Sequence, residues 1–205
     1  MEDEFLLAVL TLPAVFDGEV ELLEGLLEAG VQKLHIRKPG SAVVELENLL
    51  ERLSSRWASR LVLHGSREMA LRYGIMQVHG AVERKDGKRS GGGPFVEPGM
   101  DIAVSTSVHS WAELEVLPAG LQYAFISPLF DSISKPGYAA GKGLLLQPQV
   151  ALPCLPVGLG GIGPDTIGVL LEQGWAGAAV LGAIWNEPGI AVERYKELKK
   201  IIDER

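Results

Sequence analysis

All four histidines of the chain stand at or just after the ends of short apolar runs: His35, His64, His79 and His109. An imidazole gains and loses a proton near neutral pH, so it suits general acid/base chemistry. If the apolar runs are parallel strands, their carboxyl ends share one edge, which brings the four rings to the same end of the fold. At any single position, a half-buried histidine bonded to a carbonyl is the alternative.

A zinc site is another use for such a cluster, because imidazoles from adjacent strands can converge on one ion. A hydrolase would use that ion to activate water. No Asp or Glu completes a ligand set at these strand ends. We therefore expect no metal site here.

Two glycine-rich turns follow the last two apolar runs. The first, residues 158–163, leads into Pro164, a residue suited to the first turn of a helix. Exposed N–H groups at a helix start bind phosphate, and barrels commonly hold phosphate at their last two loops. The alternative interpretation is that these turns contain glycine only because the backbone is tightly packed there. Together the two turns predict a phosphate cradle formed by Gly160, Gly161, Gly182 and Ala183.

Cations and hydroxyls at other strand ends would complete an anion site. Side chains alternate along a strand, so His35 and Arg37 point to one face, into the barrel, and Lys38 adds charge beside them. Hydroxyl and ammonium groups suit anionic ligands. The alternative interpretation is a solvent-exposed loop, because such loops are also rich in Ser, Lys and Gly. The groups expected after the sixth strand are Ser127, Ser132, Ser134 and Lys135.

Short apolar runs alternate with helical stripes along the chain, which implies parallel strands joined by right-handed crossovers. The expected strands are 5–11, 33–37, 61–64, 76–79, 101–106, 122–126, 156–160 and 178–181. The expected helices are 19–29, 42–53, 66–73, 110–117, 165–172 and 191–202. We predict an α/β fold, a (β/α)8 TIM barrel. Residues 1–205 form a single compact domain in which the fourth and sixth helices are reduced or missing, with a loop at 80–99. An open doubly wound sheet is the alternative.

The chain has 205 residues, 47% of them apolar, and a net charge of −7. The acidic balance argues against nucleic acid as a partner. The apolar run 5–12 is far shorter than the ~20 residues of a membrane helix. Cys154 is the single cysteine, and acidic residues begin the chain where a signal peptide carries base. We expect a cytoplasmic protein with an anionic small molecule as its ligand.

Five segments together resemble the thiamine phosphate synthase/TenI family of barrels. They are residues 35–38 (HIRK), 107–110 (SVHS), 127–135 (SPLFDSISK), 158–162 (GLGGI) and 179–184 (AVLGAI). The resemblance implies a thiazole phosphate held by the backbone of the last two loops. In the synthase branch it also implies a pyrimidine pyrophosphate and Mg²⁺, with pyrophosphate leaving as a C–N bond forms. Association into a homo-oligomer is a further expectation from the family.

The chain departs from the synthase pattern at three places. His35 stands where that pattern has Gln, and residues 64–65 align with an Asn-Asp pair whose Asp holds Mg²⁺. Arg84 aligns with the second metal-binding Asp, where a cation would oppose Mg²⁺. These changes favour the other branch of the family. The carboxylates that could substitute are Glu83 and Asp86.

The TenI branch includes thiazole tautomerases, which need no metal. The resemblance implies that His109 is the general acid/base group and that Ser107 orients the substrate. Our first hypothesis is such a tautomerase, with no cofactor expected. The others are a Mg²⁺-dependent thiamine phosphate synthase and a non-catalytic phosphate-binding or regulatory protein. The substrate-binding residues expected from strands and resemblance together are His35, Arg37, Lys38, His64, His79, Ser107, Ser127, Ser132, Ser134 and Lys135.

Overall fold

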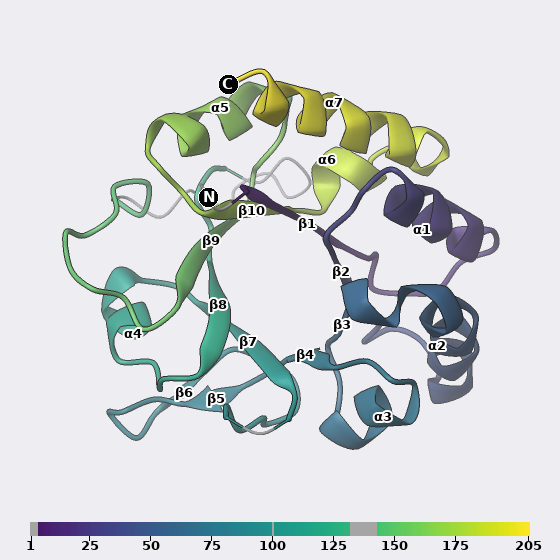
Figure 1. The fold of residues 1–205 in the computed structure, drawn as a ribbon, viewed down its shortest axis with the longest axis horizontal. Helices are drawn as coiled ribbons and strands as arrows, with labels where there is room; N and C mark the ends of the chain where they lie inside the picture. The colour runs from purple at the N-terminus through teal and green to yellow at the C-terminus, as the bar shows by residue number, and fades with distance from the viewer. Residues whose placement is uncertain (1–3, 100, 132–142) are drawn as a thin grey trace.

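A computed structural model describes residues 4–99, 101–131 and 143–205 of the chain. In these residues, parallel strands close into a barrel in the order β1-β10-β9-β8-β7-β4-β3-β2, with helices packed around it (Figure 1). The predicted (β/α)8 barrel is confirmed, and the open doubly wound alternative is wrong. None of the described helices is long and apolar enough to cross a bilayer.

The elements lie close to the predicted ranges. The barrel strands are β1 (Leu6–Leu10), β2 (Lys33–Ile36), β3 (Leu61–Leu63), β4 (Gln77–His79), β7 (Ala103–Val108), β8 (Leu121–Ile126), β9 (Leu155–Leu159) and β10 (Gly177–Val180). The helices are α1 (Glu19–Glu28), α2 (Val43–Trp57), α3 (Arg67–Arg72), α4 (Trp111–Glu115), α5 (Pro164–Glu172), α6 (Gly182–Trp185) and α7 (Ala191–Asp203). Short 3-10 turns are η1 (Ala58–Arg60) and η2 (Pro188–Ile190).

Local sequence explains how the helices begin and which face they bury. The α2 helix buries Leu49, Leu50 and Leu53, an apolar stripe at helical spacing that packs against the barrel. Ser66 caps α3, because its hydroxyl accepts a hydrogen bond from the N–H of Met69. The α2 helix continues past the predicted end at residue 53, to Trp57.

The described residues between β4 and β7, 80–99 and 101–102, hold no helix, which confirms the predicted loss of the fourth one. The predicted loop instead contains an antiparallel hairpin of β5 (Val82–Glu83) and β6 (Arg89–Ser90). Ala81 forms a bridge with Phe95, which folds the rest of the connection back toward the barrel. After β8, the described residues 127–131 and 143–154 contain no helix either.

The barrel interior is separate from the main core between strands and helices. Inside it, Leu10, Tyr123, Phe125, Val157 and Ala179 belong to a smaller apolar cluster. Polar side chains share this interior toward the carboxyl ends of the strands. The buried polar residues there include His35, His79 and Ser105.

Candidate functional site

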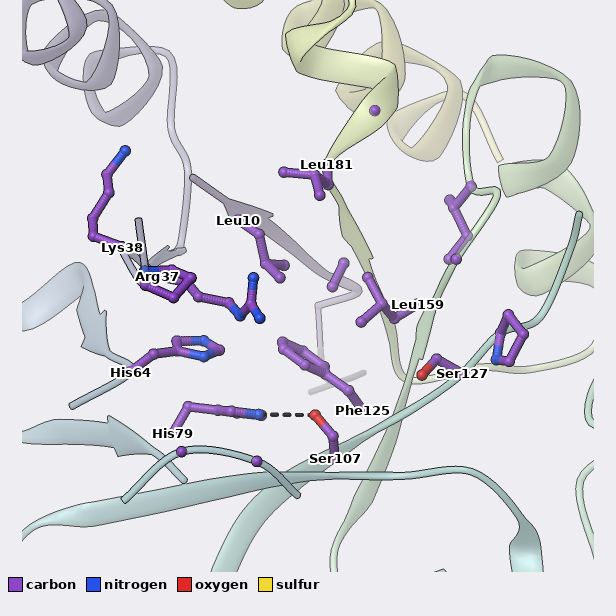
Figure 2. A pocket seen from close by; sticks show the side chains of 18 of the residues that line it. Leu10, Arg37, Lys38, His64, His79, Ser107, Phe125, Ser127, Leu159 and Leu181 are labelled. Atoms are coloured by element: carbon purple, nitrogen blue, oxygen red, sulfur yellow. Dashed lines mark hydrogen bonds between the residues drawn. The ribbon is translucent and has the colours of Figure 1, made fainter. Parts of the chain in front are cut away.

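A cavity of about 820 Å³ opens at the carboxyl ends of the barrel strands. Figure 2 shows its side chains converging from several strands and from the turns that follow them. This is where (β/α)8 barrels place their ligands. Among the described residues, no Asp or Glu lines the cavity. Its basic and hydroxyl-bearing residues are Arg37, Lys38, His64, His79, Ser107 and Ser127.

The structure brings three of the four predicted histidines together on adjacent strands. The ring centroids of His35 and His64 are 5.2 Å apart, and those of His35 and His79 are 5.5 Å apart. The rings of His64 and His79 stack at 4.3 Å. His35 and His79 are buried, and His64 is half-buried at the floor of the cavity.

Hydrogen bonds fix both ring nitrogens of His35. Its Nδ1 lies 2.9 Å from Nε2 of His64, and its Nε2 lies 2.8 Å from the hydroxyl of Tyr123. Tyr123 comes from β8, on the opposite side of the barrel. The His35 ring is therefore held deep in the interior, and only His64 of this pair faces the cavity.

His79 is held in the same way by two serines of β7. Its Nδ1 is 2.9 Å from Oγ of Ser105, and its Nε2 is 2.9 Å from Oγ of Ser107. The second of these bonds is the dashed line in Figure 2. Ser105 and Ser107 alternate along the strand, so both hydroxyls face inward.

The three imidazoles are neutral at physiological pH. Burial, and then the charge of Arg37, lower the pKa of His64 to about 3. Burial, with smaller contributions from neighbouring charges, holds the pKa of His35 and His79 well below its usual value. A neutral imidazole has one donor and one acceptor nitrogen.

Mg²⁺, which the synthase branch of the family implies, does not fit this cavity. The ion takes carboxylate and phosphate oxygens, and no described carboxylate lines the site. Asp86, named above as a possible substitute, accepts two hydrogen bonds from Arg84. Glu83 lies on the β5 strand, outside the cavity lining.

A zinc ion is the other metal to test against the histidines. Ring nitrogens of His35, His64 and His79 lie within 4.8 Å of one another. However, the rings of His64 and His79 are nearly parallel, at 22°. Imidazole lone pairs lie in the ring plane, so the lone pairs of stacked rings run side by side and do not converge. The rings as placed favour hydrogen bonding over metal binding.

The glycine turn after β9 forms another wall of the cavity. Gly160 and Gly161 line it with positive φ angles of 98° and 65°. Within the described residues, neither amide donates a backbone hydrogen bond to another described residue. Gly182 also lines the cavity, at the start of α6, whereas Ala183 lies just outside the lining.

The two cations after β2 point in different directions. Arg37 extends over the cavity toward Leu10, and Lys38 points away from it (Figure 2). The ammonium of Lys38 donates to the carbonyl of Leu12 at 2.9 Å and pairs with Glu19. The charge of Lys38 is therefore used within the fold, although its stem lines the cavity.

His109 lies outside the cavity lining. It is exposed at the end of β7, and its Nδ1 lies 3.0 Å from the carbonyl oxygen of Ser127. Ser107 and Ser127 themselves line the cavity. The remaining predicted contacts, Ser132, Ser134 and Lys135, lie outside the described residues.

Sequence reasoning missed Ser105 and Tyr123, whose hydroxyls form hydrogen bonds with His79 and His35 inside the barrel. Period-two alternation could have found them, because Ser105 shares a face with Ser107, and Tyr123 with Phe125. Which partner each side chain meets across the barrel is a property of the closed fold.

The fold and the cavity define the class: a (β/α)8 barrel with glycine turns and clustered histidines at its open end. Within that class the chain belongs to a family described as thiamine monophosphate synthase, whose family model matches residues 9–184. Members of this family act on phosphorylated small molecules.

Individual relatives agree with this assignment. The bifunctional protein ThiM/ThiE of thiamine biosynthesis from Symbiobacterium thermophilum is 26% identical over a 174-residue alignment that covers 82% of this chain and 35% of that protein. The chain thus spans about a third of that relative's length.

Two solved structures share the fold. A thiamine phosphate pyrophosphorylase from Bacteroides thetaiotaomicron is 25% identical, with a TM-score of 0.71 and coverage of 96% of this chain and 97% of that one. A protein of the same name from Pyrococcus furiosus is 20% identical, with a TM-score of 0.73 and coverage of 98% and 97%.

Proposed function

We propose that this chain binds a thiazole phosphate at the barrel mouth and moves a proton on it, as a metal-independent thiazole tautomerase of the TenI type. In this reaction a proton leaves one atom of the ligand, another atom receives a proton, and the shifted double bonds make the ring aromatic. One observation carries the proposal: neutral imidazoles face the cavity at a site where no described carboxylate does.

The phosphate would lie at the glycine turn. Gly160 and Gly161 line the cavity without side chains, so their backbone can approach phosphate oxygens closely, and Gly182 lines the cavity as well. Arg37, on the other side of the cavity, supplies a planar guanidinium that can donate two hydrogen bonds to phosphate oxygens. The heteroaromatic ring of the ligand would then rest near Phe125 and the histidines.

Two assignments of the proton-transfer group are available. The family resemblance gives His109, whose exposed ring would have to reach the ligand from the rim. The geometry favours the imidazoles that line the cavity, His64 and His79. The variants His109→Ala and His64→Ala distinguish the two assignments. Only removal of the histidine that carries the proton should lower turnover by roughly 10²-fold or more.

Thiamine phosphate synthase is the second candidate, favoured by the description of the family and by the names of its relatives. Its reaction joins a pyrimidine pyrophosphate to the thiazole phosphate and releases pyrophosphate. The negative charge of a departing pyrophosphate must be neutralised. No described carboxylate in the cavity would hold Mg²⁺ for this purpose, so the task would fall to Arg37 and to neutral hydrogen-bond donors.

A pair of turnover assays on the purified protein tests the proposal. In the first, hydroxymethylpyrimidine pyrophosphate, thiazole phosphate and Mg²⁺ are mixed, and thiamine phosphate is followed as a fluorescent oxidation product. In the second, the non-aromatic thiazole carboxylate phosphate is supplied, and aromatisation is followed by absorbance. We expect turnover only in the second. Turnover only in the first would establish a synthase, and turnover in neither, with ligand binding intact, would establish a binding protein.

A further inference from the structure

The hairpin of β5 and β6 occupies the connection that lost its helix, and its turn is joined to α4 by two contacts. The N–H of Lys85 donates to the carbonyl of Val116, at the end of α4, over 2.8 Å. Nη1 of Arg84 lies 3.5 Å from Oε1 of Glu113, in the first turn of the same helix. The hairpin therefore holds α4 both in its first turn and at its end.

Arg84 is itself fixed within the hairpin. Its Nε and Nη2 donate to the two carboxylate oxygens of Asp86, at 3.0 and 2.7 Å, and its Nη1 lies 3.4 Å from Oγ of Ser90. A two-point pair of this kind sets the plane of the guanidinium. The Arg84 side chain is 8% exposed, and Arg84 is not among the residues that line the cavity. Its charge is therefore paired within the hairpin and with α4.

Glu113 connects this cation to the residue that comes two positions before α4. Its Oε2 accepts a hydrogen bond of 2.9 Å from the N–H of His109. In a capping box, a Glu at this position would bond to the N–H of the cap residue, which is Ser110 here. Ser110 instead caps the helix through its hydroxyl, which accepts a hydrogen bond from the N–H of Glu113. The two oxygens of one carboxylate thus link Arg84 to the backbone of His109.

The ring of His109 is held by a separate hydrogen bond. Its Nδ1 lies 3.0 Å from the carbonyl oxygen of Ser127, and a carbonyl oxygen can only accept. Nδ1 therefore carries a proton, and Nε2 is bare whenever the ring is neutral. Ser127 lines the cavity. His109 is thus bonded to the cavity wall through one nitrogen and keeps the other for accepting a proton.

We propose that Arg84 and Glu113 are positioning residues that hold His109 at the cavity rim, so that its Nε2 serves as the proton-accepting atom for the bound ligand. This inference rests on the proposed tautomerase function, in the assignment that gives the proton to His109, and deepens it. His109 is then the catalytic residue. The hairpin that replaces the fourth helix supplies the cation that orients Glu113 and, through it, the backbone of His109.

The step that His109 performs balances. The bond from hydrogen to the first ligand atom breaks, its electron pair enters the ligand ring, and Nε2 gains the proton. The electron pair of the ring then forms a bond from the second ligand atom to that proton, which leaves Nε2. The histidine ends in the form in which it began.

An exposed histidine needs such support because little packing holds it. His109 is exposed at the end of β7, so its position depends on the contacts of its backbone and of its ring. Proton transfer requires the nitrogen to lie within hydrogen-bond reach of the ligand. A displacement of about 1 Å at a reacting group can cost roughly 10²-fold in rate. Loss of the contact from Glu113 should therefore affect the rate more than the affinity.

The variant Arg84→Met removes the cation without changing any group near the ligand. The side chains of Asp86 and Glu113 are 36% and 33% exposed, so neither becomes a buried unpaired charge and the fold should survive. We expect kcat for aromatisation of the thiazole carboxylate phosphate to fall by roughly tenfold or more, with little change in KM. Arg84→Lys keeps a positive charge beside Glu113 and should recover part of the loss.

Two substitutions of Glu113 separate its contacts with Arg84 and His109. Glu113→Gln keeps an oxygen that can accept from the N–H of His109 but loses the charge that pairs with Arg84. Glu113→Ala loses both contacts, so its kcat should be the lower of the two. The matched control is Glu115→Ala, which removes an exposed carboxylate of the same helix that makes neither contact and should leave kcat unchanged.

Nitrogen NMR of ¹⁵N-histidine-labelled protein follows His109 without any turnover, and the spectrum of His109→Ala identifies its signals. At a pH of about 8.5, above the ordinary histidine pKa of about 6.5, we expect the wild-type ring to carry its proton on Nδ1. Arg84→Met and Glu113→Ala should produce a mixture of the two neutral tautomers. Glu115→Ala should keep the wild-type spectrum.

The outcomes distinguish the inference from the proposed function. If the NMR pattern is as expected but the wild type has no tautomerase activity, the proposed function fails and the positioning of His109 stands. Tautomerase activity that survives His109→Ala, or a wild-type kcat in both Arg84→Met and Glu113→Ala, would overturn the inference and leave the proposed function in place. A wild-type His109 that carries its proton on Nε2 would overturn the inference as well.

Discussion

Lys38 turns its ammonium away from the cavity and forms a buried ion pair with Glu19 of α1. Both side chains are 0% exposed, and the carbonyls of Leu12 and Ala14 accept further hydrogen bonds from Lys38. The pair ties the end of β2 to the turn between β1 and α1, directly beside Arg37. Lys38 thus positions this corner of the barrel mouth.

Breaking this pair from one side should destabilise the protein strongly. Lys38→Met leaves the Glu19 carboxylate buried and uncompensated, which costs about 3–5 kcal/mol of unfolding free energy in such pairs. The double variant Lys38→Met/Glu19→Leu removes both charges and should recover most of that loss. Urea denaturation of the wild type and both variants measures the difference. Equal stability of the single and double variants would show that the pair does not act as a unit.

Stability should fall as the pH drops below about 6.5, the ordinary pKa of histidine. The folded pKa of His64 is lowered to about 3, and those of His35 and His79 are lowered as well. The unfolded chain therefore binds protons that the folded chain does not, so the contribution of these histidines is present above pH 6.5 and is lost toward pH 3.

Urea unfolding at several pH values between 7 and 5 measures this loss, in a window above most carboxylate titration. Each lowered histidine contributes a slope of up to about 1.4 kcal/mol per pH unit. The variant His64→Asn should show a smaller slope than the wild type. A free energy of unfolding that stays constant across this window would contradict the neutral histidine cluster.

A side chain at Gly161 should damage both stability and phosphate binding. A Cβ there would lie 2.4 Å from the carbonyl oxygen of Asp131, and the φ of 65° is itself unfavourable for other residues. A larger residue at this turn should therefore affect folding as well as binding. We expect Gly161→Ala to lose roughly 1–3 kcal/mol of stability and to weaken phosphate affinity.

The control for this variant is Gly174→Ala. Gly174 has a similar φ of 70°, but an added Cβ there meets nothing within 4 Å. It should lose only the part of the stability that comes from the backbone angle and keep its phosphate affinity. Calorimetric titration with thiazole phosphate, together with urea unfolding, separates the two effects. Full affinity in Gly161→Ala would remove the phosphate cradle from this turn.

Binding of thiazole phosphate should be independent of Mg²⁺. No described carboxylate lines the cavity, so the described residues do not supply the carboxylate oxygens that usually hold Mg²⁺ in a protein. Titrations in the presence of Mg²⁺ and in the presence of EDTA should give the same dissociation constant. A large gain in affinity with Mg²⁺ would mean that the ligand and the protein build a metal site together, as a synthase needs.

Much of this architecture could be predicted because its causes are local. Apolar runs alternate with helical stripes, and this alternation largely specifies a parallel barrel with helices outside. The end of each strand is also visible in sequence, so the histidines and the glycine turns could be assigned to one end of the fold. Gly160 and Gly161, which have positive φ angles, lie in the first of these turns.

The direction in which each polar group points was decided by tertiary structure. His35 meets Tyr123 from a strand 88 positions away, and only closure of the barrel brings their rings into contact. Lys38 and Arg37 are neighbours in sequence. The Lys38 side chain turns into the fold and pairs with the buried Glu19, whereas the Arg37 side chain extends over the cavity. Sequence alone determined which strand ends carry polar groups. Long-range packing decided which of them bond to each other and which remain free for a ligand, because those contacts depend on strands that lie far apart along the chain.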